Sequence, residues 1–237
     1  MNGVLRKLGW WIRDYVYAVA GQIHATVSTT QAASFRTGEL KAVVVIPGVY
    51  ESWKFMLPLI TGLHAAGHPV HVVPELHRNR LDVRSCARIV ARYIQQAGLD
   101  EVAVLAHSKG GLIGKYLMVA FDGEVRITHM VAVCTPFAGS RYARYLLIPS
   151  LRIFSPRDAL TLQMAKEERV NARISSLYGP FDPHIPEGSV LPGARNIQLP
   201  TAGHFRILAD PVTLSTVLSE MRDVPPRTAS PEAQGAL

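Results

Sequence analysis

Short apolar runs alternate with segments of helical periodicity through most of this 237-residue chain. The first run, Ala42–Ile46, is rich in β-branched residues and stops at Pro47 and Gly48, as a buried strand does. Similar runs cover 70–73, 102–105, 127–134, 174–178 and 196–199, and helical patterns cover 52–66, 82–97 and 112–120. Strands separated by helices predict an α/β fold with a mostly parallel central sheet covered by helices on both faces.

The composition fits one large domain with two appendages. Hydrophobic residues make up 48% of the chain and charged residues 18%, which supplies a sizeable core. We expect a helical arm over 1–38, a main domain over 39–223 and a disordered tail over 224–237, which is rich in Pro, Ala and Ser. Aromatic residues, arginines and prolines weaken the pattern at about 137–170, which predicts an inserted lid.

The formal charge of +7 indicates attraction to an anionic partner. That partner could be nucleic acid, a lipid surface or an acidic substrate. No RNA-recognition signature, zinc-finger spacing or basic-aromatic alternation is present, so we expect no nucleic-acid partner. Peripheral contact with an anionic membrane stays open. The basic excess over 140–174 fits such a contact, and it fits an ordinary solvated face as well.

The amino-terminal segment predicts an amphipathic helix. Arg13 and Asp14 interrupt the apolar core that an export signal or a membrane span needs. The apolar residues that fall on one helical face are Leu5, Leu8, Trp11, Ile12, Tyr15, Val16 and Val19. We expect this face to dock onto the main domain, and the alternative is a helix that lies in a membrane interface.

The two cysteines, Cys86 and Cys134, are too few for a disulfide framework and lack metal-ligand spacing, so both are predicted to be buried free thiols. This fits a reducing compartment, and the expected location is cytoplasmic, with membrane association as an option. Four histidines lie close together in the sequence: His64, His68, His71 and His77. Their spacing does not place them on one face where they could bind a metal, so they are predicted to be structural.

One motif carries the chemistry. The run Leu105-Ala106-His107-Ser108-Lys109-Gly110-Gly111 lies between a predicted strand and a predicted helix. A nucleophile elbow needs small residues around its serine because the chain reverses there in a strained conformation. Ala106 and Gly110 are small, although Ala106 stands where G-x-S-x-G has its first glycine. A plain glycine turn is the alternative interpretation.

On these residues the chain resembles the alpha/beta-hydrolase superfamily, particularly its lipase and esterase branch, over residues 41–222. The resemblance implies the chain order nucleophile, acid, histidine. It implies Asp182 as the acid, in the loop after strand 174–178, and His204 as the base, in the Gly-His loop after the last strand. Asp182 also precedes a proline, so a simple turn is the alternative there.

The resemblance further implies an oxyanion hole made by the backbone N–H groups of Val49 and Lys109. The family often has His-Gly after the first strand, where this chain has Pro47-Gly48, so the hydrogen bonds around that loop must differ. No metal or organic cofactor is expected for this chemistry, and the sequence has no dinucleotide fingerprint.

The predicted function is hydrolysis of a carboxylic ester by a Ser108-His204-Asp182 triad through an acyl-enzyme. Apolar residues of the lid favour a lipid or other apolar ester, with a short-chain ester as the next candidate. Two alternatives stay open, an acyltransferase of the same fold and a non-catalytic member that binds a membrane or a protein. Nothing in the sequence indicates an oligomeric state.

Overall fold

The computed structural model describes residues 2–145 and 154–222. Within them, six strands form one sheet in the order β2-β1-β3-β4-β5-β6. Every neighbouring pair is parallel, which confirms the predicted fold class. The strands are β1 (Ala42–Ile46), β2 (Val70–Val72), β3 (Glu101–His107), β4 (Arg126–Val133), β5 (Ile174–Tyr178) and β6 (Arg195–Gln198).

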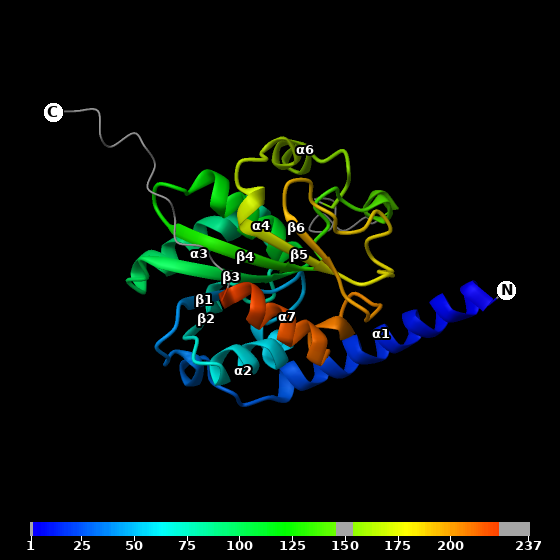
Figure 1. Cartoon of the computed structure of the whole chain (residues 1–237), viewed down its shortest axis with the longest axis horizontal. Coiled ribbons are helices and arrows are strands. Elements are labelled where there is room, and N and C mark those ends of the chain that lie inside the picture. The colour runs from blue at the N-terminus through cyan, green and yellow to red at the C-terminus, as the bar shows by residue number, and fades with distance from the viewer. Residues whose placement is uncertain (1, 146–153, 223–237) are drawn as a thin grey trace.

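Helices cover the sheet on both sides (Figure 1). The α-helices are α1 (Asn2–Val27), α2 (Leu57–Ala65), α3 (Val83–Gln96), α4 (Lys109–Ala120), α6 (Ala159–Lys166) and α7 (Pro211–Arg222). The 3-10 turns are η1 (Ala32–Phe35), η2 (Trp53–Met56), η3 (Pro74–Leu76), η4 (Arg141–Tyr145), η5 (Asn171–Arg173) and η6 (Arg206–Ala209). The predicted tail and part of the predicted lid, 146–153, lie outside the described residues.

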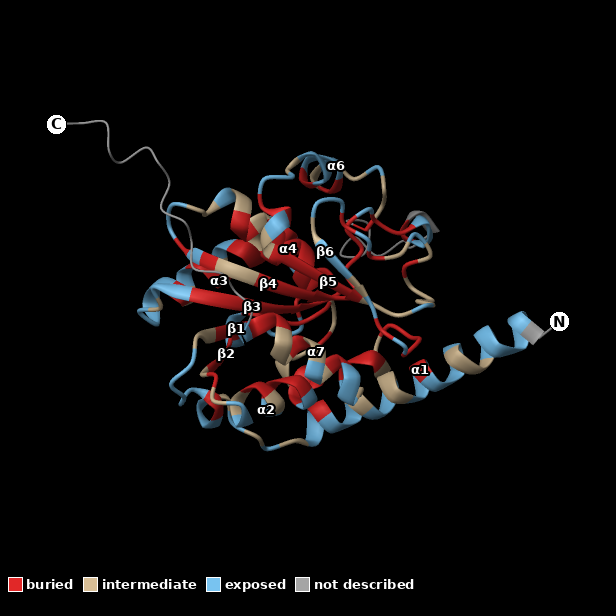
Figure 2. Cartoon of the chain, viewed as in Figure 1, coloured by how far each residue is buried: buried red, intermediate tan, exposed pale blue. Residues whose placement is uncertain are grey.

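The side chains of β1 show why its sequence is apolar throughout. Val44 and Ile46 pack with α3 and α4, whereas Val43 and Val45 pack with α2 and α7. Successive strand residues point to opposite faces, so a strand with helices on both sides needs apolar residues at every position. The central strands are accordingly buried along most of their length (Figure 2).

Two helices of the main domain differ from the sequence patterns by more than two residues. The helix predicted over 112–120 begins at Lys109, because the glycines after Ser108 are already helical but carry no side chains that reveal a periodicity. The helix predicted over 52–66 is divided into η2 and α2, and Pro58 occupies the first turn of α2, where its missing N–H is not needed.

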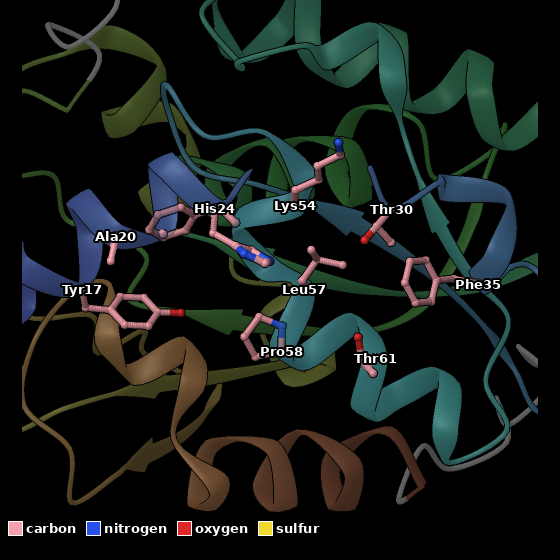
Figure 3. A pocket seen from close by; sticks show the side chains of 11 residues that line it. Tyr17, Ala20, His24, Thr30, Phe35, Lys54, Leu57, Pro58 and Thr61 are labelled. Carbon is pink, nitrogen blue, oxygen red and sulfur yellow. The ribbon is translucent and has the colours of Figure 1, made fainter. Parts of the chain in front are cut away.

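Helix α1 contacts the domain along a narrow line. Tyr17 packs edge-on against Phe55 of η2, with ring centroids 6.0 Å apart. A side chain at Gly21 would place its Cβ 2.7 Å from the Phe55 ring, so only glycine allows this approach. Beside the contact, a hollow of about 640 Å³ separates α1 from the start of α2 (Figure 3). The described residues that line this hollow include none of the candidate catalytic residues.

The expectation that the apolar face of this helix docks onto the domain is wrong. Ile12 and Val16 are 51% and 64% exposed, and Asp14 between them is fully buried. Residues two apart on a helix differ by about 200°, so both apolar neighbours project away from the side that Asp14 turns to the domain. Hydrogen bonds to Asp14, rather than burial of the apolar side chains, determine which side of α1 faces the domain.

No helix in the described part of the chain combines the length and the apolar character that crossing a membrane requires.

Candidate active site

Ser108 occupies a strained position between β3 and α4. Its backbone has φ 51° and ψ −118°, a conformation that is costly for any residue with a Cβ. The amide of Ser108 donates to the carbonyl of Val133 at 2.9 Å, which fixes the turn to the end of β4. The strained turn is the geometry that presents a serine hydroxyl at the end of a parallel strand.

The glycines after Ser108 are required by close packing. A Cβ at Gly110 would lie 2.1 Å from the carbonyl oxygen of Ile46, and one at Gly111 would lie 2.0 Å from Oγ1 of Thr135. The first turn of α4 is therefore wedged between the ends of β1 and β4. Ala106 pairs with Ile46 inside β3 and is fully buried, so its extra methyl group fits.

Asp182 and His204 form a buried pair. His204 Nδ1 lies 2.7 Å from Asp182 Oδ2, and both side chains are nearly inaccessible. The other carboxylate oxygen, Oδ1, accepts the amides of His184 and Ile185 at 2.7 and 3.1 Å. Asp182 thus stabilises a turn with one oxygen and holds the His204 ring with the other.

The surrounding charges set the protonation of the pair. Burial alone lowers the pKa of His204, but the Asp182 carboxylate and its hydrogen bond more than offset this, and the pKa is raised above its ordinary value. Burial acts to raise the pKa of Asp182, yet the nearby His204 and the hydrogen bonds lower it. Burial and the neighbouring His204 lower the pKa of His184 to about 3, so His184 is neutral.

Ser108 and His204 open onto one cavity of about 480 Å³, together with Val49. The imidazole rings of His107, next to Ser108, and His204 have centroids 4.9 Å apart. Nδ1 of His204 is taken by Asp182, so Nε2 is the ring nitrogen left for another partner. Much of the remaining wall is apolar and includes Tyr15, Pro136, Ala143, Phe154, Ile185 and Phe205.

The candidate oxyanion donor Val49 lies on a loop that is held by buried polar groups. Val49 follows Gly48, whose amide donates to Glu51 Oε2 at 2.8 Å, and the carbonyl of Pro47 accepts from Asn79 at 2.6 Å. These bonds hold the loop that contains Pro47 and Gly48.

Lys109 follows Ser108 directly, so its amide lies at the first turn of α4. Its fully buried side chain donates to the carbonyls of Asn79 and Leu81, and burial lowers the pKa of the amine. The Lys109 side chain is therefore part of the loop scaffold after β2, and only its backbone amide is a candidate donor.

Three buried residues that sequence reasoning missed hold the backbone of the His204 loop. The first is Asp14 of α1, which accepts the amides of His204, Phe205 and Arg206 at 2.9, 2.8 and 2.9 Å. A Cβ at Gly203 would lie 2.4 Å from Asp14 Oδ1, which explains the glycine before His204. The signal in the sequence was a single acidic residue inside an apolar helix, which we interpreted only as evidence against an export signal.

The other two are His107 and Glu51. Nε2 of His107 lies 3.0 Å from the carbonyl oxygen of His204, so this nitrogen carries the proton and donates it. Nδ1 of His107 lies 2.8 Å from Glu51 Oε2, and both side chains are buried. The backbone of His204 is therefore held at its amide by Asp14 and at its carbonyl by the His107-Glu51 pair.

Cys86 and Cys134 are both buried and unpaired, as predicted. In the described chain, the one cluster with metal-ligating atoms of three residues is Cys134, Asp182 and His204, with these atoms within 4.8 Å of one another. The Asp182 and His204 atoms bond each other, and burial raises the pKa of the Cys134 thiol well above its ordinary value. A protonated thiol beside a hydrogen-bonded acid-base pair is a poor metal site.

Comparison with known proteins gives the fold. Neither a family model nor a curated protein matches the sequence. Many solved structures match the coordinates, and the three described next share this architecture over about four fifths of the chain. The protein has the alpha/beta-hydrolase fold.

The similar structures include enzymes with different activities. Lipase B of Aspergillus fumigatus is 19% identical with a TM-score of 0.67, and the match covers 82% of this chain and 56% of that one. The Bacillus licheniformis lipase BlEst2 is 15% identical with a TM-score of 0.62, covering 78% and 92%. A proposed non-heme bromoperoxidase, BpoC of Mycobacterium tuberculosis, is 15% identical with a TM-score of 0.62, covering 80% and 94%. At these identities the likeness establishes the fold alone, so the reaction must be argued from the site.

Replacing Asp14 by Ala is expected to lower the free energy of unfolding by about 3 kcal/mol, because three amides of the His204 loop lose a buried carboxylate. Asp82, an exposed residue that caps α3 by accepting the amide of Ser85, provides the matched control. Asp82→Ala is expected to cost about 1 kcal/mol. Urea unfolding followed by circular dichroism measures both, and equal losses would show that Asp14 is an ordinary surface cap.

Proposed function

We propose that this protein is a serine hydrolase that cleaves carboxylic esters, with Ser108 as nucleophile, His204 as general base and Asp182 as the acid of the triad. The observation that carries the proposal is that a serine on a strained strand-to-helix turn and a histidine bonded to a buried carboxylate open onto the same cavity. This combination is costly to maintain in a protein that does not use it.

In the proposed reaction, Nε2 of His204 takes the hydroxyl proton as Oγ of Ser108 attacks the ester carbonyl carbon. The carbonyl oxygen becomes an oxyanion that accepts the amides of Val49 and Lys109. When the intermediate collapses, the alcohol leaves with the proton from His204 and the acyl group remains on the serine. A water molecule then gives a proton to His204 and attacks the acyl carbon. The carboxylic acid is released, and Oγ of Ser108 takes the proton back from His204.

The charges around His204 support this role. The raised pKa of His204 makes its ring a stronger proton acceptor, and Asp182 would stabilise the imidazolium that forms during attack. His184 approaches within 4.8 Å between ring centroids, but its lowered pKa keeps it neutral, so it adds no competing positive charge. The acid-base work therefore falls to one histidine.

The apolar cavity wall favours an ester with an apolar acyl chain. Ala143, Phe154 and Ile185 are buried and line the cavity beside Ser108. An acyl chain that displaces water from such a wall gains free energy with each methylene it buries. The proposed substrate class is therefore a lipid or another apolar carboxylic ester. A preference for short-chain esters is the alternative that an acyl-length series distinguishes.

Ser108→Ala is expected to abolish labelling by a fluorophosphonate probe and the hydrolysis of nitrophenyl esters, because the attacking oxygen is removed. The matched control is Ser140→Ala, since Ser140 opens onto the same cavity but donates its hydroxyl proton to the carbonyl of His184 at 2.7 Å. That variant is expected to keep its labelling. Labelling that survives in a folded Ser108→Ala protein would refute the nucleophile assignment.

With nitrophenyl esters of increasing acyl length, kcat/KM is expected to rise about fourfold for each methylene until the cavity is filled, since burying one methylene contributes about 0.8 kcal/mol. Ala143→Phe, which occupies part of the cavity, is expected to shift the optimum to shorter chains. A profile that is flat with chain length, or unaffected by this variant, would contradict an acyl site in the cavity.

A further inference from the structure

The outward side of α1 exposes more apolar surface than the domain needs. We define the apolar face of α1 by its ten exposed large apolar residues, each between 39% and 75% exposed: Val4, Leu5, Leu8, Trp11, Ile12, Tyr15, Val16, Val19, Ile23 and Val27. Ten of the sixteen exposed large apolar side chains in the described chain lie on this helix. Figure 2 shows the outward side of α1 exposed along its length. Such a concentration marks an interaction surface rather than the scatter of single residues that is normal on proteins.

Basic side chains border the apolar face on both sides. At 100° per residue, Lys7 and Arg13 lie about 120° to either side of the midline of this face. Arg6 lies on the same side as Arg13, and its guanidinium sits 4.9 Å from the Trp10 ring. The only acidic residue of α1, Asp14, is fully buried against the His204 loop. The solvent side of the helix therefore carries apolar and positive groups without a negative one.

The apolar face is continuous with the cavity that holds Ser108. A shallow groove on the helix is lined by apolar residues that include Ile12, Tyr15 and Val16. Tyr15 also lines the cavity with Ser108 and His204, and its ring stacks on His184 at 5.5 Å. Trp11, next to Tyr15, lines the groove as well. A molecule seated on the apolar face would thus lie beside the mouth of the cavity.

We propose that the apolar face of α1 docks the protein onto an anionic lipid surface, with the helix lying flat in the interface. The apolar residues would enter the acyl boundary while Arg6, Lys7 and Arg13 meet the phosphate groups, which is the arrangement of interfacial amphipathic helices. The substrate esters would then be lipids of that surface, a step that rests on the proposed function.

Two features favour a lipid surface over a second copy of the chain. The apolar face extends through about 160° of the helix, which is wider than the seam of a two-helix coiled coil. The chain also carries a net charge of +7, so two copies repel while an anionic surface attracts. Self-association through this face remains an outcome that the experiment distinguishes.

The test is co-flotation of the full chain with vesicles of phosphatidylcholine, alone or with phosphatidylglycerol. Binding is expected on the anionic vesicles and should weaken as salt is added. Ile12→Glu with Val16→Glu is expected to reduce affinity by at least about tenfold, and Arg6→Gln with Arg13→Gln by on the order of tenfold. Leu162→Glu is the matched control, since Leu162 is 49% exposed on α6, far from α1 in Figure 1, and it should bind as the wild type does.

The same experiment with Ser108→Ala separates this proposal from the proposed function, because vesicle binding does not need the nucleophile. Binding by Ser108→Ala supports docking even if esterase activity is absent. Failure of the wild type to float with anionic vesicles overturns the proposal, as does equal binding to neutral vesicles. The proposal would also be overturned if sedimentation showed that the wild type is a dimer and that the double variant Ile12→Glu with Val16→Glu is a monomer. That result would assign the apolar face to a second copy of the chain. Thermal unfolding of each variant confirms that it is folded.

Discussion

The backbone of His204 is held from both sides, and the rest of the site depends on this restraint. Asp14 accepts the amide of His204, and His107 donates to its carbonyl while Glu51 holds the other side of the His107 ring. With the backbone fixed, the single bond from Nδ1 to Asp182 is enough to orient the ring. In the proposed reaction His204 receives and returns a proton within one encounter, and such a role needs this pre-organisation.

This restraint also explains how α1 is attached. The helix is anchored by a polar group, Asp14, and by close packing of Tyr17 and Gly21 on Phe55, rather than by its apolar face. An apolar face that was buried against the domain could not also be available for a partner. The attachment therefore leaves that face free beside the cavity mouth, and it couples the position of the helix to the loop that carries His204.

The fold can be predicted from local sequence patterns, and so can the residues that we propose as the triad, whereas the contacts that hold the His204 loop cannot. The strand β1 has an unbroken β-branched run and the Ser108 elbow sits at a strand end, so both are readable from neighbouring residues. Asp14 and His204 are far apart in the chain, and nothing near either residue announces their contact. The prediction that the apolar face of α1 docks onto the domain failed for a similar reason. Periodicity identifies an apolar face but does not show what covers it.

An NMR titration of the His204 imidazole, with Asp182→Asn for comparison, tests whether Asp182 raises the pKa of His204. We expect a proton on Nδ1 and a pKa above 6.5 in the wild type, because Asp182 raises the pKa despite burial. The ring is then charged at low pH and becomes a base as the pH rises through that raised value. In Asp182→Asn the pKa should fall. A wild-type pKa below 6.5, or one that the substitution leaves unchanged, would contradict the claim that Asp182 sets His204 as the base.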